Sequence, residues 1–288
     1  MLGSVVVFIP ANSESKIKKG LGFTADTLLF DLEDSVSAEK KDEARLQLYH
    51  TLKNASSGIQ NLAVRINGVD TPYFDRDIEN VCMCNNIKTV VLPNATVDSV
   101  RVLDLKLNDL KSNVSIVVLI ESAEGVETAN EIVHVSNKIV GMMFGAEDYT
   151  KDIGVRRTIT GNELFYARSK LVCVGHMNHL EVIDTPTTAL HDEQIIKDDA
   201  ELAKNMGFTG KAVIHPKHID IVRKAFLPTK EEINEALDIV SEATRLFGDG
   251  MPDAFSLRGR MIDLPIIIRA RKVISDAEKY QVERGTDY

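Results

Sequence analysis

The chain has 288 residues, and its 34 Lys and Arg against 43 Asp and Glu give a formal net charge of −9 at pH 7. Hydrophobic residues make up 44% and charged residues 27%, which is typical of globular domains and excludes disordered, collagen-like and coiled-coil proteins. The negative charge argues against nucleic acid or an anionic membrane as a partner. No apolar run approaches the roughly 18 residues that a membrane-spanning helix needs.

Three cysteines, Cys82, Cys84 and Cys173, are too few for a disulfide framework, and their number is odd. Cys82 and Cys84 are two residues apart, but no second Cys or His pair has the spacing of a zinc site. We therefore expect reduced thiols and a cytoplasmic protein.

Short runs rich in Val, Ile and Leu alternate with longer segments of helical pattern, as in βα units. Their nearly continuous apolar character indicates parallel strands buried on both faces. Eight such units predict an α/β protein with a (β/α)8 TIM barrel, and a doubly wound open sheet is the alternative fold. The predicted strands are Val5–Ile9, Thr27–Glu33, Leu62–Asn67, Thr89–Pro93, Ser115–Glu121, Ile139–Ala146, Glu181–Asp184 and Lys211–His215.

The segment after Pro228 lies outside this count of eight units. Thr229 and Glu232 have the spacing of a capping box, so we expect a helix that begins there and ends near Phe247. We therefore divide the chain into a barrel, residues 1–228, and a C-terminal helical extension, residues 229–288. Helices are also predicted over Ala38–Leu52, Glu163–Met177, Asp192–Met206 and about Leu264–Tyr280, and a turn-rich linker is predicted over Gly248–Pro252.

Acidic side chains interrupt the apolar pattern near the carboxyl ends of three predicted strands. Asp31 and Glu33 end one strand, Glu121 ends another, and Asp148 follows a third. Side chains alternate between the faces of a strand, so we expect Asp148 on the face of Phe144. The carboxyl ends of barrel strands form the mouth where active sites lie, so we expect these acids to converge.

Several carboxylates at one mouth would repel each other, and burial of each unpaired charge is costly. A divalent cation removes both problems, and oxygen ligands without Cys or His favour Mg²⁺ or Mn²⁺ over zinc. The competing interpretation is that each acid caps the next helix, for which Asp34 is the best candidate. Arg65 would add a fixed positive charge for a substrate oxygen, or would form a structural ion pair with one of the acids.

A set of motifs occurs in one order over nearly the whole chain and resembles the citrate lyase β subunit and its relatives in the HpcH/HpaI aldolase superfamily. The sequence departs from that pattern in three places: Asn94 follows Pro93 where relatives often have Lys, residues 2–4 replace a frequent Arg, and His179 stands where relatives often have Gly. The matching motifs are Phe30–Val36 with Lys41–Arg45, Val64–Gly68, Leu119–Ala123, Phe144–Tyr149, Glu163–Arg168, Gly207–Lys211, Ile214–Pro216 and Gly259–Pro265.

The resemblance implies a homotrimeric barrel that binds Mg²⁺, with Mn²⁺ as an alternative, and that cleaves or forms β-hydroxyacyl thioesters. Glu121 and Asp148 would be the metal ligands. Asp31 and Glu33 would hold water at the metal, and Arg65 would contact the thioester oxygen. The substrate is then a small-molecule acyl thioester of CoA or of an acyl-carrier protein.

The resemblance also implies a reaction in which a citryl thioester gives oxaloacetate and an acetyl thioester through an enolate. Asp263 would be the general acid/base, delivered from the C-terminal segment of a neighbouring subunit. Glu33 or a hydroxide would take the hydroxyl proton. The 2-oxo acid carboxylate would be held by backbone N–H groups of Gly145, Ala146 and Glu147.

Three alternatives stay open at the level of sequence. The first alternative is a stand-alone citramalyl-CoA or malyl-CoA lyase, in place of a citrate lyase subunit that works with carrier-protein and transferase subunits. A second alternative is an aldolase for 2-oxo acids that needs no thioester. The third is a non-catalytic scaffold that retains the barrel.

Overall fold

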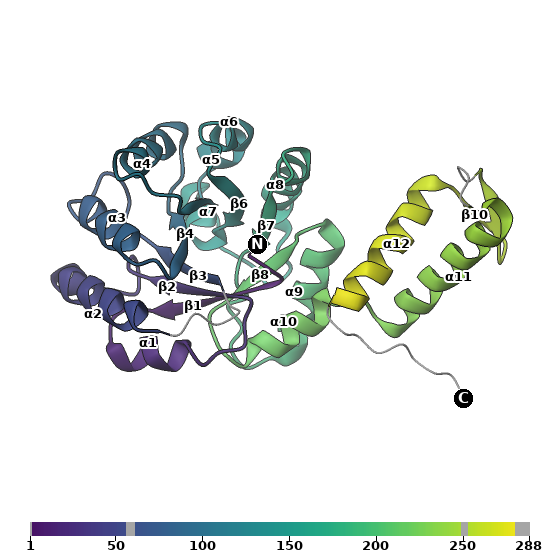
Figure 1. The fold of residues 1–288 in the computed structure, drawn as a ribbon, viewed down its shortest axis with the longest axis horizontal. Helices are drawn as coiled ribbons and strands as arrows, with labels where there is room; N and C mark the ends of the chain where they lie inside the picture. The colour runs from purple at the N-terminus through teal and green to yellow at the C-terminus, as the bar shows by residue number, and fades with distance from the viewer. Residues whose placement is uncertain (1, 56–60, 249–252, 280–288) are drawn as a thin grey trace. The chain divides into compact units, whose positions relative to one another are not determined.

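The computed structural model describes residues 2–55, 61–248 and 253–279. Eight parallel strands form a closed barrel in the order β1 to β8, with helices outside it (Figure 1). This confirms the predicted (β/α)8 barrel and excludes the open sheet. The strands are β1 (Val5–Pro10), β2 (Thr27–Asp31), β3 (Asn61–Arg65), β4 (Ile87–Leu92), β5 (Ser115–Ile120), β6 (Ile139–Phe144), β7 (Glu181–Asp184) and β8 (Gly210–Val213).

All eight predicted strands are present, but six of the predictions extend one or two residues beyond the observed carboxyl end. The apolar pattern continues there because residues just past the strands are still buried, as Leu32 and Ile66 are. Their backbones have left the regular ladder and are turning into the loops above the barrel. Glu33 and Glu121 therefore lie in the loop bases, two residues and one residue beyond their strands, whereas Asp31 is the last residue of β2.

The helices of the barrel unit alternate with its strands. The predicted helices over Ala38–Leu52, Glu163–Met177 and Asp192–Met206 are confirmed, the first two with an initial 3₁₀ turn. The elements are α1 (Glu14–Gly20), η1 (Ala38–Lys40), α2 (Lys41–Lys53), α3 (Phe74–Met83), α4 (Val97–Asp109), α5 (Ala123–Glu127), α6 (Ala129–Val133), α7 (Ala146–Asp152), η2 (Asn162–Leu164), α8 (Phe165–Met177), α9 (Glu193–Met206) and α10 (His218–Phe226).

Inward-facing side chains from all eight strands fill the barrel and set the face on which the site residues lie. Leu29 of β2 and Ala63 of β3 point inward, and side chains two residues apart share a face. Asp31 and Arg65 therefore point inward at the upper rim. The interior cluster comprises Leu2, Val6, Leu29, Ala63, Val91, Val117, Leu119, Met143, Ile183 and Ala212, with Phe8 packed against it.

The chain forms two compact units, Met1–Arg223 and Lys224–Tyr288. The second contains α11 (Lys230–Phe247), the hairpin strands β9 (Phe255–Leu257) and β10 (Arg260–Ile262), and α12 (Leu264–Lys279). Thr229 and Glu232 form the predicted capping box at the start of α11. Residues 249–252 of the predicted linker and Tyr280 of the predicted last helix lie outside the described residues.

The hairpin was not predicted, because strands of three residues are too short to show a period of two. The two residues that join the strands, Arg258 and Gly259, identify the hairpin, because both have positive φ, 51° and 78°. That backbone is typical of the two-residue turns that join antiparallel strands. The hairpin therefore places Ile262 in the core formed by α11 and α12.

None of the described helices combines the length and the apolar character needed to cross a membrane. The three cysteines are free thiols, of which Cys84 is buried, Cys82 is partly buried and Cys173 is exposed.

A network of four charged side chains, three of them buried, lies between strands β7 and β8 and helices α8 and α9. Lys211, which is fully buried, lies 2.6 Å from Asp184 and 2.8 Å from Asp199. Arg168 lies 2.9 Å from both of these carboxylates. Burial alone would raise the pKa of Asp199, but the charges of Lys211 and Arg168 outweigh it and hold the pKa well below its usual value.

We expect Asp199 to make the protein acid-sensitive. Because its pKa is lower in the folded than in the unfolded chain, its stabilisation is complete above about pH 4 and is lost as the pH falls through the folded pKa. Urea unfolding should show a loss on the order of 1–3 kcal/mol over that range. Asp199→Asn should be less stable near neutral pH and lose less on acidification, whereas the control Asp198→Asn, at an exposed position, should follow the wild type. Equal acid sensitivity in all three proteins would contradict this prediction.

Candidate active site

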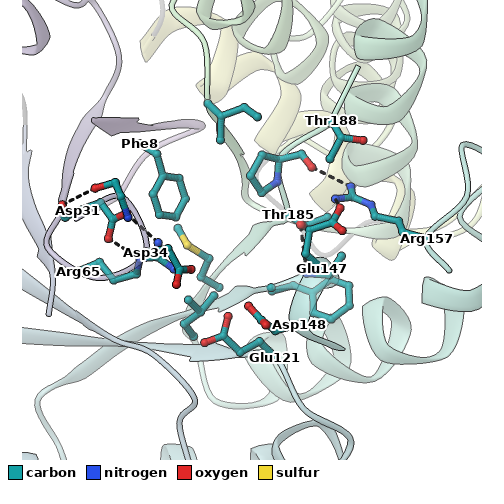
Figure 2. Close-up of a pocket in the computed structure, with 18 of the residues that line it drawn as sticks. Phe8, Asp31, Asp34, Arg65, Glu121, Glu147, Asp148, Arg157, Thr185 and Thr188 are labelled. Carbon is teal, nitrogen blue, oxygen red and sulfur yellow. Dashed lines mark hydrogen bonds and ion pairs between the residues drawn. The ribbon is translucent and has the colours of Figure 1, made fainter. Parts of the chain in front are cut away.

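A cavity of about 410 Å³ opens at the carboxyl ends of the barrel strands (Figure 2). Phe8 and Pro10 of β1 line one part of it, and Leu119 and Met143 form its floor from β5 and β6. Nearly all site residues predicted within the barrel line this cavity; Glu33 does not and adjoins it through Arg65. The predicted lining residues are Asp31, Arg65, Glu121, Gly145, Ala146, Glu147 and Asp148.

Arg65, the last residue of β3, is buried among carboxylates. Its Nε and Nη2 donate to the two oxygens of Asp31 at 2.8 and 2.9 Å, a bidentate pair that joins β3 to β2. Its Nη1 lies 2.8 Å from Glu33 and 3.4 Å from Asp34. The structural ion pair considered for Arg65 therefore exists, and the same side chain lines the cavity.

Asp31 anchors this arginine. Burial would raise the pKa of Asp31, but the hydrogen bonds and charge of Arg65 outweigh it and keep the pKa low. The backbone N–H groups of Glu33 and Ser35 also donate to its two oxygens, at 2.9 and 3.1 Å. With the two bonds from Arg65, these fill the acceptor capacity of the carboxylate. Asp31 and Glu33 were both expected to hold water at a metal. Asp31 has no acceptor position left for a water molecule, whereas Glu33 has an oxygen that can accept one.

The loop that carries these acids is held by Lys41, the first residue of α2. Its ammonium group donates to the carbonyl oxygens of Leu32 and Glu33 at 2.8 and 2.7 Å. Burial lowers the pKa of Lys41, although nearby acids, Asp31 first among them, favour its charge. A cation bonded to main-chain carbonyls fixes the turn, so the Lys41–Arg45 motif has a structural role beside the site.

Arg45, four residues later on the same face of α2, supports the neighbouring loop. It donates to Asp77 of α3 at 2.6 Å. The other oxygen of Asp77 accepts from the backbone and side-chain N–H groups of Asn67 at 2.9 and 2.6 Å. The loop that follows Arg65 is therefore fixed by a fully buried carboxylate, and Arg65 is held from both sides.

Glu121 is buried, and no cationic side chain among the described residues forms an ion pair with it. Its Oε1 accepts from the backbone N–H of Asn94 at 2.7 Å, and Asn94 adopts a left-handed backbone with φ 46°. Burial raises the pKa of Glu121 to about 8, and the charges of Glu33 and Asp148 act in the same direction against that of Arg65. A Cβ at Gly145 would lie 2.5 Å from Oε2, so the position needs glycine for this carboxylate to fit.

Asp148 approaches the cavity from the first turn of α7, and its carboxyl group lies beside that of Glu121 (Figure 2). The expectation that it continues the face of Phe144 was wrong, because β6 ends at Phe144 and alternation does not extend into a helix.

Burial raises the pKa of Glu33 to about 7. The charges of Asp34, Asp31 and Asp148 raise it further, and the charge of Arg65 opposes them. Its buried Oε2 contacts Arg65 as an ion pair without hydrogen-bond geometry.

The donor set fits a hard divalent cation. Among the described residues, no group of three or more His, Cys, Asp or Glu side chains is arranged to hold a metal. Mg²⁺ commonly binds through one or two protein carboxylates, with water and substrate oxygens completing the shell. Glu121 and Asp148 supply such a pair, and the uncompensated charge of Glu121 favours a cation.

Two details of the sequence prediction are corrected. Asp34 is not a helix cap: the first helical turn after β2 begins at Ala38 with Ser37 at its N-cap, and Asp34 lines the cavity. The backbone N–H groups of Gly145 and Ala146 are already engaged, with the carbonyl of Ile120 at 2.9 Å and with Thr185 Oγ1 at 3.2 Å. The proposed contact with a 2-oxo acid therefore rests on Glu147.

Arg157 lines the cavity and was not predicted. Its Nη1 lies 2.9 Å from Glu147, and its Nη2 donates to the carbonyl of Pro186 at 2.8 Å. It belongs to the irregular loop between α7 and η2, where no period of two or 3.6 marks an inward side chain. Phe8 was also missed as a site residue; its ring lies 5.2 Å from the guanidinium carbon of Arg65.

Asp263 belongs to the second unit and is partly buried at the start of α12. Its Oδ1 accepts from the backbone N–H of Ile266 at 3.3 Å, which is the contact of a helix N-cap. The carboxylate therefore has a fixed position between the hairpin and α12.

Residues 4–216 match the model of the family described as HpcH/HpaI aldolase/citrate lyase. The chain is 34% identical to citrate lyase subunit beta of Leuconostoc mesenteroides subsp. cremoris, over 95% of this chain and 92% of that protein. It is 30% identical to mitochondrial citramalyl-CoA lyase of Mus musculus, over 94% and 84%. The crystal structure of CitE from Mycobacterium tuberculosis with magnesium, acetoacetate and coenzyme A has a TM-score of 0.82 at 28% identity and covers 96% of this chain and 98% of that one.

We expect Glu121→Gln to weaken Mg²⁺ binding at least about 10-fold, since a neutral amide replaces a ligand charge. The amide oxygen still accepts from Asn94, and the loss of a poorly compensated buried carboxyl should leave the metal-free melting temperature equal or higher. Calorimetric titration with MgCl₂ and thermal unfolding measure both effects. Glu124→Gln, at an exposed position on α5, is the control and should bind Mg²⁺ normally. Unchanged affinity in Glu121→Gln would remove Glu121 from the metal site.

Proposed function

The chain belongs to the HpcH/HpaI aldolase/citrate lyase family, and on this premise we propose that it is a Mg²⁺-dependent carbon–carbon lyase. Its reaction is the cleavage of a citryl thioester to oxaloacetate and an acetyl thioester, as the name of its bacterial relative suggests. The observation that carries the proposal is one cavity in which Glu121 and Asp148 lie together beside a buried arginine, Arg65.

The metal supplies Lewis-acid polarisation of the substrate hydroxyl and adjacent carboxylate, and we assign its binding to Glu121 and Asp148. Arg65 faces the thioester oxygen and stabilises the negative charge that collects there when the carbon–carbon bond breaks. Because Asp31 holds its guanidinium in a bidentate pair, Arg65 needs no reorganisation during the reaction.

We assign the hydroxyl proton to Glu33, which adjoins the cavity through Arg65 and would take the proton through one water molecule. A carboxyl group with a pKa of about 7 is matched to proton transfer near neutral pH. The hydroxyl carbon becomes the ketone of the 2-oxo acid, and the electrons of the broken bond pass to the thioester enolate. Asp263 then donates a proton to the enolate carbon, and solvent returns both carboxyl groups to their starting states.

We assign Asp263 to the site of a neighbouring subunit in a homotrimer, so that the barrel unit carries the metal and the C-terminal unit completes the site. We further propose that the protein acts in the cytoplasm and, as a β-type subunit, works with carrier-protein and transferase subunits. The thioester is then presented on an acyl-carrier arm or as the CoA ester.

A second candidate substrate is the citramalyl thioester, which would give pyruvate in place of oxaloacetate. The similarity to citramalyl-CoA lyase over 94% of the chain supports it. Both substrates use the same metal and the same enolate, so they differ only in the group carried by the ketone carbon.

The reaction is tested with the full chain, Mg²⁺ and citryl-CoA. Oxaloacetate should appear and oxidise NADH through malate dehydrogenase, and chelation of the metal with EDTA should stop the reaction. Citramalyl-CoA with lactate dehydrogenase reports pyruvate in a parallel assay. Turnover of 2-oxo acids with free aldehydes and without a thioester would point to the aldolase instead, and no turnover in any assay would point to a scaffold.

We expect Asp263→Asn to lower turnover at least about 100-fold, the scale of a lost general acid/base, with Mg²⁺ binding intact. Asparagine is as good an N-cap as aspartate, so α12 keeps its cap and the loss is chemical. Asp276→Asn, on the same helix, is the control.

Mixing Asp263→Asn with Glu121→Gln tests the trimer. In co-assembled random trimers, about a quarter of the sites would combine an intact Glu121 and an intact Asp263 from two subunits. Activity should therefore return on mixing. Its absence, in trimers shown to contain both variants, would place Asp263 outside the neighbouring subunit's site.

A further inference from the structure

Two arginines line the cavity, and they differ in how fully they are paired. Arg65 contacts three carboxylates, those of Asp31, Glu33 and Asp34. Arg157, whose side chain is 12% exposed, contacts the carboxylate of Glu147, whose side chain is 63% exposed. A pair with so exposed a partner is weak and exchangeable.

The position of Arg157 is opposite that of Arg65. Figure 2 shows Asp31 and Arg65 on one side of the cavity, Arg157 on the other, and Glu121 and Asp148 between them. In the proposed reaction Arg65 takes the thioester oxygen and the two acids hold the metal. The group on the far side of the ketone carbon is therefore directed toward Arg157.

The guanidinium of Arg157 is oriented before any ligand binds. The carbonyl of Pro186 accepts from Nη2 at 2.8 Å and fixes the plane of the group. The carboxylate of Glu147, 2.9 Å from Nη1, occupies the place of an anionic ligand. Glu147 is thus an internal carboxylate that a substrate carboxylate can replace at low cost.

Resting on the proposed function, we propose that Arg157 determines specificity by binding the second carboxylate of a 2-oxo dicarboxylic acid. Oxaloacetate is pyruvate with one carboxylate added at the methyl carbon. A site with a cation aimed at that carboxylate binds oxaloacetate well, and it leaves the cation without that ligand when pyruvate binds. Arg157 therefore directs the chain toward citryl rather than citramalyl thioesters.

The test is calorimetric binding of freshly dissolved oxaloacetate and of pyruvate to the full-length protein with saturating Mg²⁺. The wild type should bind oxaloacetate at least about 10-fold more tightly than pyruvate. Arg157→Gln should weaken oxaloacetate binding by about 10-fold or more and change pyruvate binding less than about 3-fold. Arg156→Gln is the control, because Arg156 is exposed and lines the adjacent cavity of about 660 Å³ but not this one.

Glu147→Gln gives a second test that does not depend on the arginine variant folding. The variant keeps the backbone N–H of Glu147 that we assign to the 2-oxo acid, and removal of the internal carboxylate should leave oxaloacetate binding equal or tighter. Equal losses for both acids in Arg157→Gln, no loss for either, weaker oxaloacetate binding in Glu147→Gln, or no preference in the wild type would each overturn the proposal. If the wild type bound neither acid in a Mg²⁺-dependent way, the proposed function would fall as well.

Discussion

The burial of Arg65 at the rim of the barrel is the interaction on which the site depends. A guanidinium removed from water needs anionic partners, and Asp31 supplies them from the neighbouring strand through two hydrogen bonds. This pair fixes the rim of β2 against that of β3. Lys41 and Arg45 hold the loops on either side, so the charge is supported by main-chain and side-chain contacts that lie outside the cavity.

The same arginine explains why acids with the same chemistry have different roles. Asp31 is neutralised and fully hydrogen-bonded, and its pKa is held low. Glu121 has one backbone N–H as a partner, and burial raises its pKa to about 8. A site that separates its carboxyl groups in this way can keep one as a permanent anion and leave another to bind a cation. Position along the chain does not distinguish the two; their partners do.

The barrel could be predicted from the sequence because eight buried parallel strands appear as eight apolar runs. Glu121 could be predicted as a residue of the barrel mouth because burial of a charge at the end of such a run is costly. The sequence placed Asp148 in the site for the wrong geometric reason, since the acid comes from a helix and not from a strand. It could not find Arg157 or Phe8 as site residues. The inward orientation of Arg157 in a loop depends on tertiary contacts such as that with Pro186. Phe8 lies within an apolar strand, where the sequence does not separate a residue of the cavity wall from one of the core.

Charge at the mouth also affects the binding of ligands. The described residues that line the cavity include five acids and two arginines, a formal excess of three negative charges, and protonation of Glu121 reduces it only to two. An anionic acyl group entering that field is repelled by the lining acids, and a low dielectric strengthens the repulsion. The divalent cation that we propose for Glu121 and Asp148 would lower this excess to one negative charge. On the proposed function, we therefore expect the cation to favour binding of the acid, and we expect the carboxylate of Glu147 to pair with Arg157 while no acid is bound.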